Sequence, residues 1–130
     1  MAYVVDYKTI TVPDTTTSVT PQLPKHEADD YIILWAAADM TAGDLALTTL
    51  GNWVKIDDNT DSSNSIIAYY LKCSSSSETV SAITGTSGNC YGAVAVTVRD
   101  VDPNTPINDY EIGSATDVSG RWQLPRTTTT

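Results

Sequence analysis

The sequence of 130 residues contains no phenylalanine and one histidine, and its 7 basic residues are outnumbered by 16 acidic ones. A chain with a formal charge of −9 and no basic run lacks the lysines and arginines that bind phosphates, so we expect neither nucleic acid nor a membrane as a partner. No stretch approaches the roughly 20 apolar residues that a membrane-spanning helix needs. The N-terminus also lacks the basic start and apolar block of a signal peptide, so secretion by the usual route is not expected.

Residues that bind metals or form disulfides are also scarce. Cys73 and Cys90 are the only cysteines, which is too few for a disulfide scaffold. We interpret them as reduced thiols at strand ends, with a mutual disulfide as the alternative. His26 lies in a Pro-flanked loop and alone cannot make a zinc site, which needs three or four nitrogen or sulfur ligands. We interpret His26 as a solvated loop residue, and we predict no cofactor.

What the chain does contain is β-forming residues. Val, Ile, Thr, Tyr and Trp together supply 50 of the 130 positions, and Thr alone supplies 20. Branched and aromatic side chains lose rotamer freedom in a helix but fit a pleated, half-buried surface. The composition therefore predicts an all-β protein.

Short alternating segments separated by turn residues predict the strands. Residues 31–38 form a continuous apolar run, which favours a central strand buried on both faces, with Trp35 inside. Residues 45–50 fit a short helix or a strand equally well. Residues 57–64 are expected to form a polar loop. The strands expected over residues 65–72, 79–84 and 91–98 are joined by short loops and are expected to form an antiparallel meander. The other expected strands are residues 2–12, 53–56 and, more weakly, 107–112.

This spacing predicts an antiparallel β-sandwich or jelly-roll-like fold, which another subunit or further C-terminal strands would complete. The sandwich domain is expected to span residues 1–112, with an extended N-terminal arm over residues 1–23. Residues 113–130 are expected to form a Thr-rich tail.

Several landmarks recur in the same order in a known group of proteins. They are Pro24, Asp30 before an apolar strand, Gly51-Asn52-Trp53, Glu78 after the strand of residues 65–72, and Val98-Arg99-Asp100-Val101-Asp102 with Pro106-Ile107. Over about residues 20–110 the chain is similar to β-sandwich proteins encoded in bacteriophage structural-gene clusters and prophages. Asp100 departs from that pattern, because the group carries a glycine there.

The resemblance implies a non-enzymatic component of a bacteriophage virion, made in the host cytoplasm. Such a protein is a head decoration or cement protein, or a part of a tail or fibre. Its expected partners are other virion proteins and further copies of itself, as a homo-oligomer. The alternative is a carbohydrate-binding adhesion module of a fibre or cell surface, in which exposed aromatic rings stack on sugars.

Two sequence patterns resemble catalytic sites. Residues 88–92, around Cys90, have the outline of a nucleophile elbow, but a strand is expected after them where a helix is required, and His26 is the one histidine available as a base. Asp100 and Asp102 resemble paired carboxylates, although no converging partner is evident, and we interpret them as turn-capping residues. We therefore predict no enzymatic activity.

One pattern resembles half of a calcium loop. Asp57, Asn59 and Asp61 alternate as the first ligands of such a loop do, but the glycine and the closing glutamate are missing. This candidate metal site competes with a plain hairpin loop that Asp and Asn favour.

The candidate assembly residues lie near the two ends of the chain. Trp122 and Arg121 lie in the polar tail, where a single chain offers little core, and Tyr3 and Tyr7 lie in the N-terminal segment. Extended, Thr-rich segments carry unpaired backbone groups that can join the edge of a neighbour's sheet. On this interpretation residues 1–23 and 107–130 carry assembly.

Deleting residues 113–130 is expected to leave a folded core and to abolish association with particles. Circular dichroism would check the fold, and co-sedimentation with particles would check association. Normal incorporation of the shortened chain would contradict the expectation.

Overall fold

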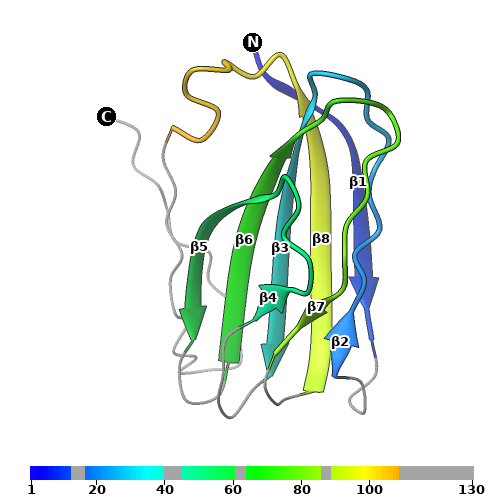
Figure 1. Ribbon diagram of the computed structural model, residues 1–130, viewed down its shortest axis with the longest axis vertical. Coiled ribbons are helices and arrows are strands. Elements are labelled where there is room, and N and C mark those ends of the chain that lie inside the picture. Colours follow the sequence, from blue (N-terminus) through cyan, green and yellow to red (C-terminus); the bar gives the residue numbers. More distant parts are fainter. Residues whose placement is uncertain (13–16, 40–44, 61–63, 86–88, 109–130) are drawn as a thin grey trace.

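The computed structural model describes residues 1–12, 17–39, 45–60, 64–85 and 89–108 (Figure 1). Within these ranges the chain forms eight strands in two antiparallel sheets and no helix. This confirms the prediction of an all-β, sandwich-like fold. The strands are β1 (Tyr3–Thr11), β2 (Ser18–Val19), β3 (Tyr31–Asp39), β4 (Ala46–Leu47), β5 (Val54–Thr60), β6 (Asn64–Lys72), β7 (Ile83–Thr84) and β8 (Asn89–Arg99).

The two sheets are unequal in size. The larger has the strand order β1-β8-β3-β6-β5, and the smaller, β2-β7-β4, consists of two-residue strands. Figure 1 shows the small sheet and its loops in front of the large one. The central strand is β3, as its apolar sequence predicts, and it pairs with β6 on one side and β8 on the other.

Two expectations about the strands were wrong. The meander does not form, because β3 separates β6 from β8 and the segment between them contributes only β7, which belongs to the small sheet. Residues 57–60 are not a loop, because β5 continues to Thr60 paired with β6. The strand expected over residues 2–12 is present as β1, which pairs with β8 along its length.

Two weaker expectations are now decided in part. Ala46–Leu47 forms a strand, so the helical alternative for residues 45–50 is wrong. Residues 107 and 108 are not in a strand, and residues 109–112 lie outside the described ranges.

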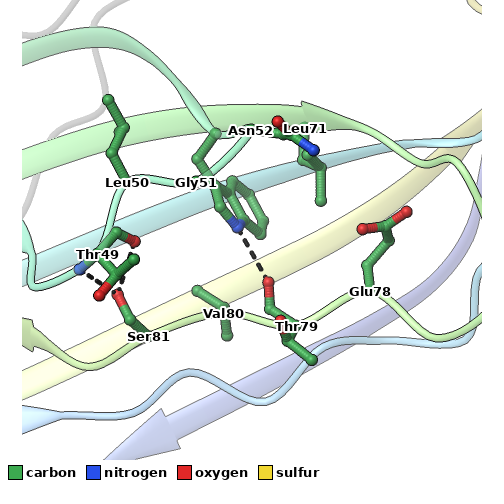
Figure 2. Close-up of a pocket in the computed structure, with 10 residues that line it drawn as sticks. Thr49, Leu50, Gly51, Asn52, Leu71, Glu78, Thr79, Val80 and Ser81 are labelled. Carbon is green, nitrogen blue, oxygen red and sulfur yellow. Dashed lines mark hydrogen bonds between the residues drawn. The ribbon is translucent and has the colours of Figure 1, made fainter.

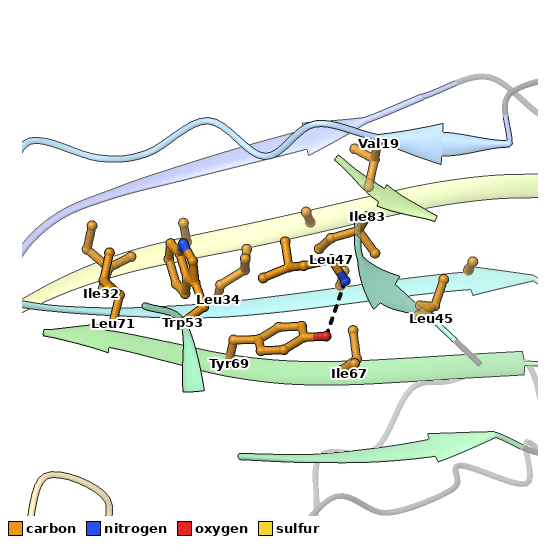
Figure 3. Packing of buried hydrophobic residues seen from close by; sticks show 14 of the residues in the cluster. Val19, Ile32, Leu34, Leu45, Leu47, Trp53, Ile67, Tyr69, Leu71 and Ile83 are labelled. Carbon is orange, nitrogen blue, oxygen red and sulfur yellow. Dashed lines mark hydrogen bonds between the residues drawn. The ribbon is translucent and has the colours of Figure 1, made fainter. Parts of the chain in front are cut away.

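The hydrophobic core lies between the two sheets (Figure 3). Alternate residues of β3 and β6 point into it, and the short strands of the small sheet cover them. The largest fully buried apolar residues are Val19, Ile32, Leu34, Leu45, Ile67 and Ile83. The second half of β3 and the facing part of β8 present small side chains to this core, namely Ala36, Ala38, Ala93 and Ala95.

A tight turn places Trp53 at one end of the core (Figure 3). Gly51 takes a positive φ of 55°, a conformation that costs glycine little, and Trp53 N–H then donates to the Leu50 carbonyl at 3.0 Å. The Trp53 indole is 4% exposed, and its Nε1 donates to the Thr79 carbonyl at 3.2 Å. Trp53 thus packs one end of the core.

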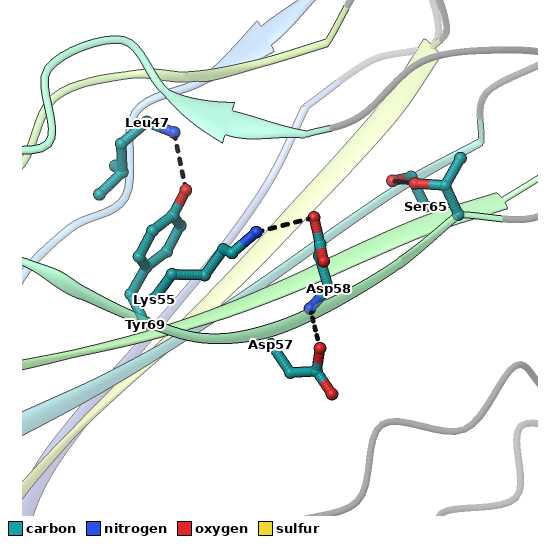
Figure 4. Close-up of polar contacts among 7 residues, drawn as sticks. Leu47, Lys55, Asp57, Asp58, Ser65 and Tyr69 are labelled. Carbon is teal, nitrogen blue, oxygen red and sulfur yellow. Dashed lines mark hydrogen bonds and ion pairs between the residues drawn. The ribbon is translucent and has the colours of Figure 1, made fainter.

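A single buried hydroxyl joins the two sheets (Figure 4). Tyr69 on β6 is 3% exposed, and its hydroxyl oxygen accepts the backbone N–H of Leu47 on β4 at 3.2 Å. Because β4 is only two residues long, its pairing with β7 leaves the Leu47 N–H without a backbone acceptor, and the Tyr69 hydroxyl supplies an acceptor. An unpaired buried N–H would cost about 1–3 kcal/mol.

Tyr69→Phe is expected to lower the free energy of unfolding by about 1–2 kcal/mol, because it leaves the Leu47 N–H unpaired. Chemical denaturation would measure the change. Tyr70→Phe, one residue along and on the opposite face of the sheet, is the matched control and should alter stability by less than about 0.5 kcal/mol. Equal effects of the two variants would contradict this role for Tyr69.

Candidate interaction surface

The large sheet has a second face, which points away from the core. Antiparallel neighbours in register place their side chains on the same side, so the strand pairing identifies this face row by row. No described strand packs against it. We call it the outer face, and its residues are Val4, Tyr7, Thr9 and Thr11 of β1; Gly92, Val94, Val96 and Val98 of β8; Tyr31, Ile33, Trp35 and Ala37 of β3; Ile66, Ala68, Tyr70 and Lys72 of β6; and Val54, Asp57 and Asn59 of β5.

The outer face is apolar at its centre and partly exposed, although two of its residues, Tyr31 at 5% and Ala68 at 2%, are buried. Trp35 lies in one row with Val94 and Ala68, and Ile33 lies in the next with Val96 and Tyr70. Trp35 is 37% exposed and Val94 is 38% exposed, and exposure rises toward the edge strands, to 45% at Val54 and 65% at Tyr7. The prediction that Trp35 is buried was therefore wrong. Contiguous apolar patches of this kind mark interaction sites on soluble proteins.

More apolar bulk points outward than inward along the two central strands. Toward the core, β8 presents Ala93, Ala95 and Thr97, whereas toward the outside it presents Val94 and Val96. On these two strands the bulkier set of alternate side chains therefore faces away from the core. A strand that is apolar on both sides is typical of a sheet covered on both faces.

Charge is nearly absent from the outer face. Lys72 and Asp57 are the only ionisable acids or bases in its rows, and both are engaged. Lys72 pairs with Asp29 at 3.2 Å, and an Asp57 carboxylate oxygen accepts the backbone N–H of Asp58 at 2.8 Å. The face is therefore unlike the rest of a chain with a net charge of −9.

The predicted assembly residues fall on different parts of the structure. Tyr7 belongs to the outer face, whereas Tyr3 pairs with Arg99 and lies toward the opposite face. A β-bulge between Val4 and Asp6 causes the difference, since one extra residue reverses the alternation of side chains. Trp122 and Arg121 lie outside the described residues.

The candidate calcium ligands lie on an extended strand. Asp57 and Asn59 are two residues apart on β5, with Asp57 pointing to the other side of the sheet from Asp58 (Figure 4). An extended strand does not curl its oxygens round an ion as a calcium loop does. Asp61 lies outside the described residues, and among the residues that are described no group of three His, Cys, Asp or Glu side chains is placed to hold a metal.

A buried ion pair anchors one end of the large sheet. Asp30 is 1% exposed, and Arg99 binds its carboxylate with two hydrogen bonds, Nε to Oδ1 at 2.7 Å and Nη2 to Oδ2 at 2.8 Å. The Asp30 carboxylate also accepts the Glu27 backbone N–H at 2.8 Å. The hydrogen bonds from Arg99 lower the pKa of Asp30. This pair joins the start of β3 to the end of β8.

His26 joins two loops beside this ion pair. Its Nδ1 donates to the Pro24 carbonyl at 2.7 Å, and its Nε2 accepts the backbone N–H of Glu78 at 3.1 Å. These bonds fix one neutral tautomer of the ring. His26 is half-buried, so its interpretation as a solvated residue was wrong. Glu78 in turn accepts three hydrogen bonds from Ser74 and Ser75, which lower its pKa.

The residues around His26 line a depression of about 630 Å³. Basic and acidic side chains alternate along it, and its Arg99 is bound by Asp30 and lies 3.2 Å from Glu27. A smaller depression of about 320 Å³ lies beside Trp53 (Figure 2). Its one aromatic ring is buried and its indole N–H is committed to Thr79, so it offers no stacking platform.

The residues that resemble catalytic sites have structural contacts or lie apart. Asp102 caps a turn, because its carboxylate accepts the backbone N–H of Asn104 at 2.9 Å. Asp100 is exposed and takes a positive φ of 61°, a conformation in which glycine is strain-free. Cys73 is buried, which raises the pKa of its thiol to about 12. The side chain of Cys90 lies outside what the structure describes.

Comparison with known proteins adds no relative. No protein-family model matches the chain, and no curated protein or solved structure is significantly similar to it. In the described part of the chain, no helix is long and apolar enough to cross a membrane.

Sequence reasoning missed the exposed residues at the centre of the outer face. Trp35 sits inside a continuous apolar run, so alternation gives no sign of which side faces solvent. In β8 a signal is present, because valines occupy one set of alternate positions and small residues the other. The usual expectation that the larger residues face the core assigns the two sides the wrong way round.

Asp30→Asn is expected to lower the free energy of unfolding by about 3 kcal/mol at neutral pH, because it breaks a buried, doubly hydrogen-bonded ion pair. Because the folded-state pKa of Asp30 is lowered from 3.8, the stabilisation is complete above that value and is lost as the pH falls below it. The difference between wild type and variant should therefore shrink in acid. Denaturation curves at several pH values would measure it.

Glu27→Gln is the matched control. Glu27 contacts the same guanidinium at 3.2 Å, but its side chain is 72% exposed. Its loss should cost less than about 1 kcal/mol. A difference between wild type and Asp30→Asn that stays constant with pH would contradict the assignment.

Proposed function

We propose that this protein is a non-enzymatic structural component of a bacteriophage particle, and that it acts through protein–protein contacts made by the outer face. The observation that carries the proposal is the apolar, nearly uncharged outer face around Trp35 and Val94. A surface of this composition is suited to burial against another protein rather than to contact with water.

The landmark residues of the phage β-sandwich group fit a scaffold role. Asp30 and Arg99 form the ion pair at the end of the sheet, and Trp53 closes the end of the core. These residues therefore stabilise the fold and leave the outer face available for contacts. The proposal covers a head decoration or cement protein and a tail or fibre component alike.

A carbohydrate-binding adhesion module is the second candidate. The observation in its favour is that Trp35 and Tyr7, both exposed, lie on one flat sheet face. Aromatic rings on such a face can stack on sugar rings. Binding to a glycan array that is lost in Trp35→Ala would favour this candidate over an assembly role.

The wild-type chain is expected to co-sediment with particles of the phage that encodes it, and Trp35→Lys should reduce the bound amount at least about tenfold, because a charge is placed at the centre of a buried contact. Gradient sedimentation followed by quantitative immunoblotting would measure it.

Leu50→Lys is the matched control, since Leu50 is 51% exposed and lies on the loop beside Trp53, away from the outer face. It should sediment as the wild type does. Undiminished association of Trp35→Lys would contradict an assembly role for the outer face.

A further inference from the structure

We propose that the outer face is covered by the outer face of a second copy of this chain, so that two large sheets pack face to face in a two-fold dimer. The inference rests on the proposed function, because it names a second copy as the partner of the same surface, so that association with the particle requires the dimer. Each large sheet would then be covered on one face by its own small sheet and on the other face by the large sheet of the second copy.

The size of the face fits a stable dimer. Five strands about 4.8 Å apart, with about eight residues each at 3.3 Å, give a face of about 600 Å². Two such faces together bury about 1,200 Å², the lower end of the range for specific, stable interfaces. The contact needs no other part of the molecule to reach this size.

The distribution of charge favours self-association through this face alone. Two copies with a charge of −9 repel each other, and salt screens that repulsion only beyond about 8–10 Å. Most charged residues described by the structure lie on the loops and the core-side surface, including Asp6, Glu27, Asp58 and Glu78. On the outer face, packing brings together two sheets with no unpaired like charges at their centres.

The shape of the outer face suits an isologous contact, in which both copies use the same surface. Trp35 projects from one row, and the next row along the strands carries Ala37 and Gly92. A Cβ added at Gly92 would lie in ordinary contact with Ile10 and Thr11, at 3.8 and 3.9 Å, so the two residues beside each other in this row, Gly92 and Ala37, are small and stand low on the face. A two-fold axis perpendicular to the strands reverses the order of the rows and seats each Trp35 over the small residues of the other copy, as self-complementary contacts require.

The oligomeric state of the full chain tests the inference. Light scattering during gel filtration, from about 1 to 100 µM, should give a dimer for the wild type. Trp35→Lys and Val54→Lys should each weaken the dimer at least about tenfold and give monomers at the lower concentrations. Val54 lies on the edge strand and is 45% exposed, so its substitution leaves the core intact even if Trp35→Lys does not fold.

Leu50→Lys supplies the control, because it adds the same charge four residues from Val54 on an exposed apolar side chain of the other face. It should remain dimeric. A wild type that is monomeric at about 100 µM, or an oligomer that Val54→Lys leaves intact, would overturn the inference.

The particle assay separates this inference from the proposed function. A monomeric wild type whose particle association is lost in Trp35→Lys would overturn the dimer and leave the function standing, with another virion protein or residues 109–130 on the face. A dimer lost in Trp35→Lys with undiminished particle association would support the dimer and count against the proposed function.

Discussion

Strand β3 carries apolar side chains on both of its faces, and the rest of the structure depends on how each face is covered. Ile32 and Leu34 are fully buried under the small sheet, whereas Trp35, between Leu34 and Ala36, points to the other side. Burial of one such side chain is worth about 1.5–3 kcal/mol, so leaving a whole face open forgoes a large stabilisation. Burial of this second apolar face against another surface would therefore add to the stability of the sheet.

Polar contacts hold the small sheet and its loops on the core, because the strands of that sheet are too short to do so alone. The second sheet has two-residue strands, and its ladder alone would hold it weakly. The Tyr69 hydroxyl, the Trp53 indole and the His26 ring each bind a backbone group of a neighbouring loop or strand. Together with the Asp30–Arg99 pair, they allow a thin layer to seal the core.

Much of the sheet could be predicted from the sequence, but its order could not. The strands around β1, β3, β6 and β8 follow from alternation and from the apolar run of residues 31–38, because side-chain period and branching are local properties. Pairing of β1 with β8 joins residues far apart in the sequence, from Thr11 with Gly92 to Tyr3 with Arg99, which no local pattern encodes. The outer face was missed for a related reason: in an apolar run, only the finished packing decides which residues face outward.

The order of the large sheet also governs when the molecule can fold. The central strand β3 needs both β6 and β8 beside it, and β1 pairs only with β8, the last of the strands in the described part of the chain. Closing such long loops is entropically slow, and sheets built from distant pairings are slow folders. During synthesis on the ribosome, the apolar run of β3 therefore stays without both of its neighbouring strands until more than half of the described strands have emerged. In this interval the nascent chain is most exposed to aggregation.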